Sequence, residues 1–169
     1  MSTYKRFEDL PVWRAAIDLA LAVFALTEDR AFGQQGDLRS QLRRAALFVS
    51  NNIAEGFERG TTNELLAFLY IARGSAGEVR SMLQFTKRME RMAHLKSQIS
   101  NLKSQAESCS RQLRGWADSL QNSDIRGQRH LNEHVRQTYD QQRRAEAFLE
   151  KLQQVQTGHH TGVDEQSDE

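Results

Sequence analysis

Apolar residues recur along this chain at spacings of three and four, which is the period of an amphipathic α-helix. The first stripe predicts a helix that begins near Asp9, with Pro11 in its first turn, where a missing N–H costs little. Its main positions are Trp13, Ile17, Ala20, Phe24 and Thr27. Residues 28–37 break the pattern. A second stripe then runs through Leu38, Leu42, Ala46, Val49, Ile53 and Gly56.

Two further helices are predicted between Thr61 and residue 121. Thr61 and Glu64 have the spacing of a capping box, and apolar residues continue from there toward Met89. A short internal repeat, LKSQISN followed by LKSQAES, begins the next stripe. This stripe has the spacing of a coiled-coil seam and comprises Leu95, Ile99, Leu102, Ala106, Cys109, Leu113, Trp116 and Leu120. We place the turn between the two helices near residues 92–98.

The periodicity predicts an all-α fold, because no stretch alternates like a β-strand. Antiparallel packing within the chain is the simplest way to cover four apolar seams, so we expect a four-helix bundle domain over residues 1–127. Residues 128–156 form one more amphipathic stretch, predicted to be a C-terminal helix that packs on or extends the bundle. The acidic residues 157–169 are predicted to be a disordered tail.

The stretch QLRRAALFVSNNIAEGFERG, residues 41–60, is apolar on most sides and still carries amides, a carboxylate and arginines. A helix that is apolar over so much of its circumference is buried on more than one side, and a neighbouring subunit is the expected cover. Buried polar groups then need partners, since an unpaired one costs about 1–3 kcal/mol. We interpret the set as fixing register at a subunit interface; direct ligand binding is the alternative. The predicted interface residues are Arg43, Arg44, Phe48, Asn51, Asn52, Glu55, Phe57 and Arg59.

The net charge of +1 conceals an asymmetry along the chain. The tail holds four acidic residues and no Lys or Arg, so residues 1–156 carry a net charge of +5. Residues 80–114 contain eight basic residues against only Glu90 and Glu107. Such a cluster is commonly a solvated helix face, whereas gathering on one side makes a surface for phosphates. The predicted RNA- or DNA-binding residues are Arg80, Lys87, Arg88, Arg91, Lys96, Lys103, Arg111 and Arg114.

Cysteine usage and hydropathy indicate the compartment. The single cysteine, Cys109, has no partner for an internal disulfide, so nothing points to secretion. The first residues lack the apolar core of a signal peptide, and the run LALAVFAL is too short to cross a bilayer. We therefore expect a cytoplasmic protein that does not enter membranes.

Enzyme chemistry is weakly supported by the sequence. The segment HLNEH, residues 130–134, has the H-x-x-E-H spacing of inverted zinc peptidases, but a third ligand from a second element is missing. Glu55 and Glu78 are candidates to face each other across the bundle, where arginines would satisfy them. Cys109 lies on a seam and is expected to be an inert core residue. We predict no catalytic residue, no metal and no cofactor.

Four segments carry a resemblance to a known family. FEDLPVWRAA, FGQQGDLRSQLRRAA, NNIAEGFERG and FLYIARGSAGE occur in order, and the match extends over roughly residues 7–121. They resemble the four-helix-bundle proteins encoded in intervening sequences of bacterial 23S rRNA genes. The resemblance implies an up-down-up-down bundle that assembles into a homo-oligomeric ring of five. More distantly, the chain is similar to the accessory variability protein of diversity-generating retroelements, which works with a reverse transcriptase and contacts nucleic acid.

Pattern and resemblance together predict a non-enzymatic, oligomeric helical-bundle protein. Its expected activity is binding, to itself and to RNA or DNA through an arginine-rich surface. The alternative is a scaffold or accessory adaptor for a partner protein, such as a reverse transcriptase, without affinity for nucleic acid of its own.

Overall fold

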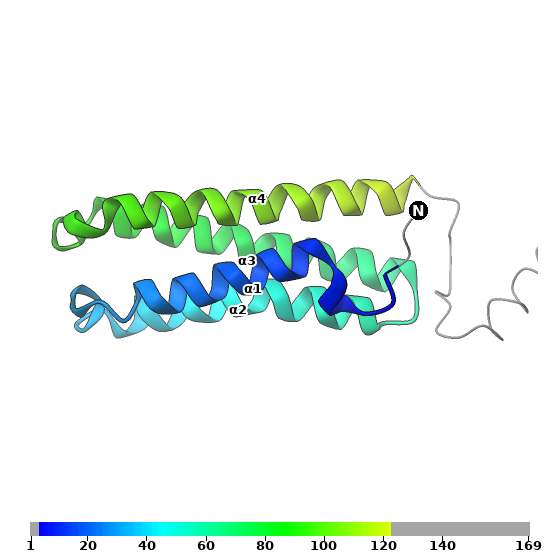
Figure 1. Cartoon of the computed structure of the whole chain (residues 1–169), viewed down its shortest axis with the longest axis horizontal. Helices are drawn as coiled ribbons and strands as arrows, with labels where there is room; N and C mark the ends of the chain where they lie inside the picture. The colour runs from blue at the N-terminus through cyan, green and yellow to red at the C-terminus, as the bar shows by residue number, and fades with distance from the viewer. Residues whose placement is uncertain (1–3, 123–169) are drawn as a thin grey trace, which may run out of the picture. The chain divides into compact units, whose positions relative to one another are not determined.

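The computed structural model describes residues 4–122, which form four long α-helices joined by short connections (Figure 1). Helix α1 spans Pro11–Leu26, α2 spans Gly36–Glu58, α3 spans Thr62–Arg88 and α4 spans Lys96–Gln121. Successive helices run in opposite directions. The predicted all-α helical bundle is confirmed. The helix expected at residues 128–156 and the acidic tail at 157–169 lie outside the described residues.

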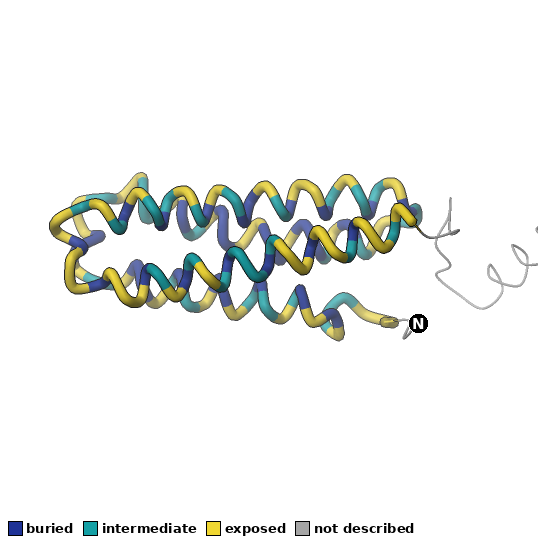
Figure 2. The backbone as a smooth tube through the Cα atoms, turned by 90° about the horizontal axis from the view of Figure 1, so that it is seen from above, coloured by how far each residue is buried: buried dark blue, intermediate teal, exposed yellow. Residues whose placement is uncertain are grey.

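Each helix packs against two neighbours: α2 lies between α1 and α3, and α4 lies between α3 and α1. Three 3₁₀ turns accompany the helices, η1 at Phe7–Asp9, η2 at Arg30–Phe32 and η3 at Glu90–Leu95. The backbone coloured by burial shows that the buried residues of every helix face the inside of the bundle (Figure 2). The amphipathic stripes therefore meet along one axis, as hydrophobic burial requires.

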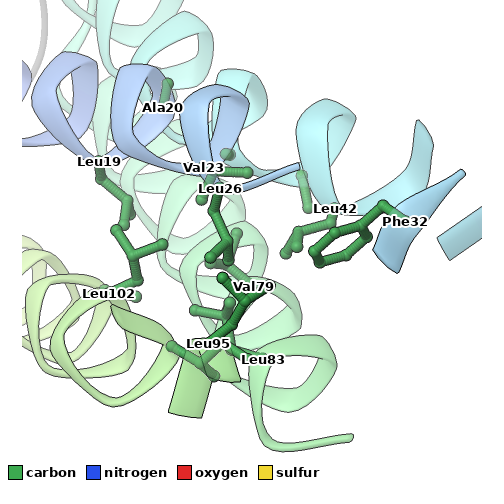
Figure 3. Packing of buried hydrophobic residues seen from close by; sticks show 14 of the residues in the cluster. Leu19, Ala20, Val23, Leu26, Phe32, Leu42, Val79, Leu83, Leu95 and Leu102 are labelled. Carbon is green, nitrogen blue, oxygen red and sulfur yellow. The ribbon is translucent and has the colours of Figure 1, made fainter. Parts of the chain in front are cut away.

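The core receives side chains from all four helices. Figure 3 shows Leu19 of α1 and Leu102 of α4 pointing toward each other, with Phe32 of η2 beside Leu42 of α2. The predicted seam of α4 is buried from Leu95 to Leu113, and the predicted stripe of α2 is buried from Leu42 to Gly56. Both predictions are confirmed over these residues. Leu47 and Phe48 lie outside the α2 stripe and are each 39% exposed, and Trp116 and Leu120 at the end of the α4 seam are half-buried.

The buried face of α1 differs from the predicted one. Val12, Ala16, Leu19 and Val23 are buried. Of the predicted stripe, Ala20 and Thr27 are buried as expected, whereas Trp13, Ile17 and Phe24 are only half-buried. This helix is apolar at most positions, so its sequence does not single out one stripe. Packing against α2 and α4 selects the stripe one residue earlier. Its start is also shifted: Asp9 belongs to the preceding 3₁₀ turn, and Leu10 is the N-cap without a side-chain cap.

The two connections around α3 follow local chemistry. Thr61 Oγ1 accepts a hydrogen bond from the backbone N–H of Glu64 at 3.2 Å and donates one to the Glu64 carboxylate at 2.8 Å. The N-cap half of the predicted capping box is therefore confirmed, while the Glu64 carboxylate bonds to the Thr61 hydroxyl. At the other end α3 stops at Arg88, extended backbone follows at Met89, and η3 leads into α4. The turn therefore begins three residues before the predicted range of 92–98. Buried Met92 and Leu95 close that end of the core.

Helices α2 and α3 approach most closely at Gly56. A Cβ atom added there would lie 2.6 Å from Cβ of Phe68 and 3.3 Å from Cδ1 of Leu65. Glycine is required because any side chain would collide with α3. This contact fixes the register of α2 against α3.

Candidate functional site

Two polar contacts cross between α3 and α4 and define which sides of these helices face each other. Arg80 pairs with Glu107 at 3.1 Å, and the Gln121 amide donates to the Tyr70 hydroxyl at 2.8 Å. Since the helices are antiparallel, these contacts also set the register: residues later in α3 lie level with residues earlier in α4.

Basic side chains line both edges of this α3–α4 contact. On α3, Arg73, Arg80 and Lys87 are spaced by seven residues, two helical turns, so they share one side of the helix. On α4, two basic residues precede Glu107, by 11 and by four positions, and two follow it, by four and by seven. At these spacings all four lie on the same side of the helix as Glu107. They are Lys96, Lys103, Arg111 and Arg114. We call these seven residues the basic face.

Most charges of the basic face are not neutralised by residues of the four-helix bundle that the structure describes. Arg80 is paired with Glu107, and Arg114 lies 3.6 Å from Asp118. The other five make no ion pair with any residue between 4 and 122. The Arg80 Nε atom is buried and has no hydrogen-bond partner among residues 4–122. The Arg80 side chain as a whole is 36% exposed, so it lies between the two helices and still reaches solvent. The face thus presents a concentrated positive charge to solvent.

Two predicted residues lie apart from the basic face, and one residue was missed. Arg88 is exposed in the last turn of α3. Arg91 is exposed in η3, and its guanidinium donates to Gln34 at 3.4 Å. The missed residue is Arg73, which lies outside the predicted range of residues 80–114. Its seven-residue spacing from Arg80 and Lys87 was the signal that places it on the basic face.

The predicted interface residues of α2 occupy several separate places. Arg43 is mostly buried, with 18% of its side chain exposed. Its Nε donates to Thr27 Oγ1 at 2.7 Å, it pairs with Glu28, and its guanidinium lies 4.8 Å from the centre of the Phe24 ring. Arg43 therefore ties α2 to the C-terminal end of α1 within one chain.

The other end of the predicted set forms an ion-pair group at the surface. Arg59 donates to Glu55 at 2.7 Å, lies 3.9 Å from Glu64, and stacks over the Phe68 ring. The bond to Glu55 raises the pKa of Arg59. The Glu55 side chain is 51% exposed in the single chain, so its burial stays a prediction for an assembly.

The remaining members of the set differ in burial. The amide of Asn52 is buried and donates to the Phe48 carbonyl of its own helix at 2.6 Å, rather than meeting an arginine. Asn51 is exposed. Phe57 is half-buried and packs on the core.

A groove lies on the outer side of α2 and α3. Its volume is about 590 Å³, and it is lined by Gln41, Arg44, Ala45, Phe48, Ser75, Glu78, Ser81 and Met82. The Arg44 guanidinium lies 5.1 Å from the centre of the Phe48 ring, which is 39% exposed. Neither Arg44 nor Glu78 makes an ion pair within the described part of the chain.

The placement of Glu78 contradicts one sequence-based idea. Glu78 lies level with Arg44, whereas Glu55 lies beside the Gly56–Phe68 contact, 11 residues and about 16 Å farther along α2. Glu55 and Glu78 therefore do not face each other.

The groups considered for catalysis are placed as follows. Burial raises the pKa of the Cys109 thiol to about 11, so the thiolate nucleophile is scarce at neutral pH. Residues 4–122 contain no group of three or more His, Cys, Asp or Glu that would hold a metal ion. The HLNEH segment lies outside the described residues. None of the four helices is long and apolar enough to cross a membrane.

The fold and its surfaces define the class of protein: an all-α helical bundle with one strongly basic face and one partly apolar groove. Comparison with known families gives the particular group. Residues 8–115 match the model of the 23S rRNA-intervening sequence protein family. The match covers more than half of the chain, and the chain belongs to this family. No curated protein matches it closely enough to add a relative.

Proposed function

We propose that this protein binds RNA or DNA through the basic face of α3 and α4, without catalysing a reaction. The observation that carries the proposal is the alignment of seven basic side chains along the two edges of one helix–helix contact, where Glu107 and Asp118 are the only acidic partners among residues 4–122. Lysine and arginine on one face are the electrostatic footprint of phosphate recognition.

Binding of this kind is driven by release of counterions from the phosphate backbone. If about five phosphates are neutralised, affinity for duplex DNA should fall about 500-fold between 50 mM and 200 mM salt. Base specificity should be weak, because the contacts are to phosphates and carry no sequence information.

A filter-binding or mobility assay tests the proposal with one structured RNA and one duplex DNA. Retention of at least one of them at 50 mM salt, lost steeply toward 200 mM, is the expected result. No retention of either at 50 mM salt would overturn the proposal.

A second candidate, self-association, is favoured by the α2–α3 groove. Phe48 is 39% exposed, and Ile71 and Phe85 of α3 are 51% and 59% exposed on the outer side of that helix. Unpartnered apolar side chains beside a groove are typical of protein contacts. We propose that copies of this chain assemble through this surface, as the ring implied by the sequence resemblance requires. The adaptor alternative uses the same surface for a different protein.

Light scattering behind a sizing column tests assembly directly. A mass several times 19.4 kDa at micromolar concentration is expected. A monomer at that concentration would contradict self-association and leave the surface to a different protein.

A further inference from the structure

An aromatic side chain, Tyr70, lies at one end of the basic face, one turn before Arg73. Tyr70 is 43% exposed. Its hydroxyl accepts a hydrogen bond from the Gln121 amide at 2.8 Å, which ties the ring to α4 and restricts its rotation. Arg73 lies three residues farther along α3, one turn away on the same side.

Among residues 4–122, nothing covers the surface next to this ring. Gly74 and Gly77 follow Tyr70 at four and seven residues, so they lie one and two turns along the same side of α3. A Cβ atom added at either position meets no atom within 4 Å. Side chains on a helix lean toward its N-terminus, so any larger residue at position 74 would lie over the Tyr70 ring. Glycine at this position leaves the ring face open.

The same glycines have no close packing contact with any residue between 4 and 122. At Gly56 an added Cβ would lie 2.6 Å from Phe68, whereas positions 74 and 77 have free space around them. A helix with glycine at an interior position is less stable than the same helix with alanine there, by about 1 kcal/mol. The open ring and the bare backbone beside it therefore form a flat area bordered by Arg73 and Arg80.

We propose that Tyr70 is a stacking platform for an unpaired base, so that the nucleic acid bound by the basic face is single-stranded at this point. This inference rests on the proposed function. Sequence-tolerant binding of single strands combines a positively charged track for the backbone with aromatic rings on which bases stack. In a duplex each base is stacked between its neighbours, so its face is hidden. A duplex would therefore contact the basic residues without stacking on Tyr70.

The test compares a fluorescein-labelled 20-nucleotide RNA of mixed sequence with the same strand annealed to its complement, by anisotropy at 50 mM salt. Tyr70→Ala should weaken binding of the single strand by about tenfold, within the range reported for loss of one base–aromatic stack. Duplex affinity should change less than about twofold. Tyr70→Phe keeps the ring and should bind the single strand nearly as well as the parent protein.

A second variant tests whether misfolding, rather than loss of stacking, causes the weaker binding of the single strand. Gly74→Gln places a helix-favouring side chain over the ring, so it should raise the melting temperature while weakening single-strand binding. Equal losses for single strand and duplex in Tyr70→Ala, or unchanged single-strand affinity in both variants, would overturn the stacking role and leave the basic face intact. Failure of both nucleic acids to bind the parent protein would instead overturn the proposed function itself.

Discussion

Helix α3 contributes to two surfaces of opposite character. Toward α4 it carries Arg73, Arg80 and Lys87, and the surface is basic. Toward α2 it carries Ser75, Glu78 and Met82, which line a groove beside the exposed Phe48 ring. Under the two proposals, one side of α3 binds phosphates and the other side contacts a second protein chain. Assembly and nucleic-acid binding need not compete for the same residues.

The largest expected effect separates assembly from binding. Phe48→Glu places a charge in the α2–α3 groove, where burial against another copy would be costly, so the assembly should dissociate toward single chains. Light scattering measures the mass. Leu21→Glu is the matched control, because Leu21 is 65% exposed on α1. A mass that falls equally in both variants, or in neither, would contradict a contact at the groove.

The next effect concerns the helix contact that underlies both surfaces. Gly56→Ala inserts a methyl group 2.6 Å from Cβ of Phe68, so α2 and α3 must move apart. Overpacking of this kind costs about 1–3 kcal/mol of unfolding free energy. Denaturant unfolding gives the value, with Gly77→Ala as the control. The control should be stabilised by up to about 1 kcal/mol, since its methyl group meets open space. Similar values for both variants would show that the close approach at Gly56 is absent.

A smaller effect is expected at the ion pair of α2. Glu55→Ala removes an exposed i,i+4 pair with Arg59, and such pairs contribute only about 0.3–0.5 kcal/mol. We predict that thermal melting shows a loss of this size when the protein is dilute enough to be monomeric. A cost of 1 kcal/mol or more that appears only in the assembled protein would show that Glu55 is buried between copies, as the sequence suggested.

The smallest effect lies at the end of the bundle, away from both surfaces. The Ala31 N–H, and after it the His94 ring, lower the pKa of Asp29. A carboxyl group whose pKa is lowered by folding stabilises the fold above its unfolded pKa, about 3.9, and this stabilisation disappears as the pH falls through the folded value.

Asp29→Asn should therefore lower the melting temperature at neutral pH, and the gap from the parent protein should narrow below about pH 4. Melting curves measured from pH 2 to pH 7 provide the check. The exposed Asp37→Asn variant serves as the control. A gap that is constant across this range would show that ionised Asp29 has no role in stability.

Much of the fold was predictable because the apolar stripes of α2 and α4 recur at helical spacing from Leu42 to Gly56 and from Leu95 to Leu113. The exception is α1, where apolar residues occur on nearly every side and only packing against two neighbours selects Val12, Leu19 and Val23 for burial. The break after Arg88 was placed a few residues late, because no Pro or Gly marks it.

The candidate site was predictable in composition but not in arrangement. The sequence identified the basic residues between 80 and 114, since charge can be counted. Pairing across helices was not visible: Arg80 with Glu107, and Arg43 with Thr27 and Glu28, depend on which sides of two helices meet. Tyr70 was overlooked for the same reason, because its contact with Gln121 of α4 is not visible in the sequence, whereas the seven-residue spacing of Arg73 was visible and was missed.

The most direct test of the account is duplex DNA affinity at 50 mM salt in two double variants with the same change in net charge. Lys103→Glu with Arg111→Glu alters the basic face, and Lys5→Glu with Arg30→Glu alters exposed residues elsewhere. We predict that the first pair weakens binding by more than about tenfold and reduces the salt slope by about 2, while the mass of the assembly is unchanged. The second pair should stay within about threefold of the parent protein. Equal losses in the two pairs would show that only total charge matters, and would contradict a binding site on α3 and α4.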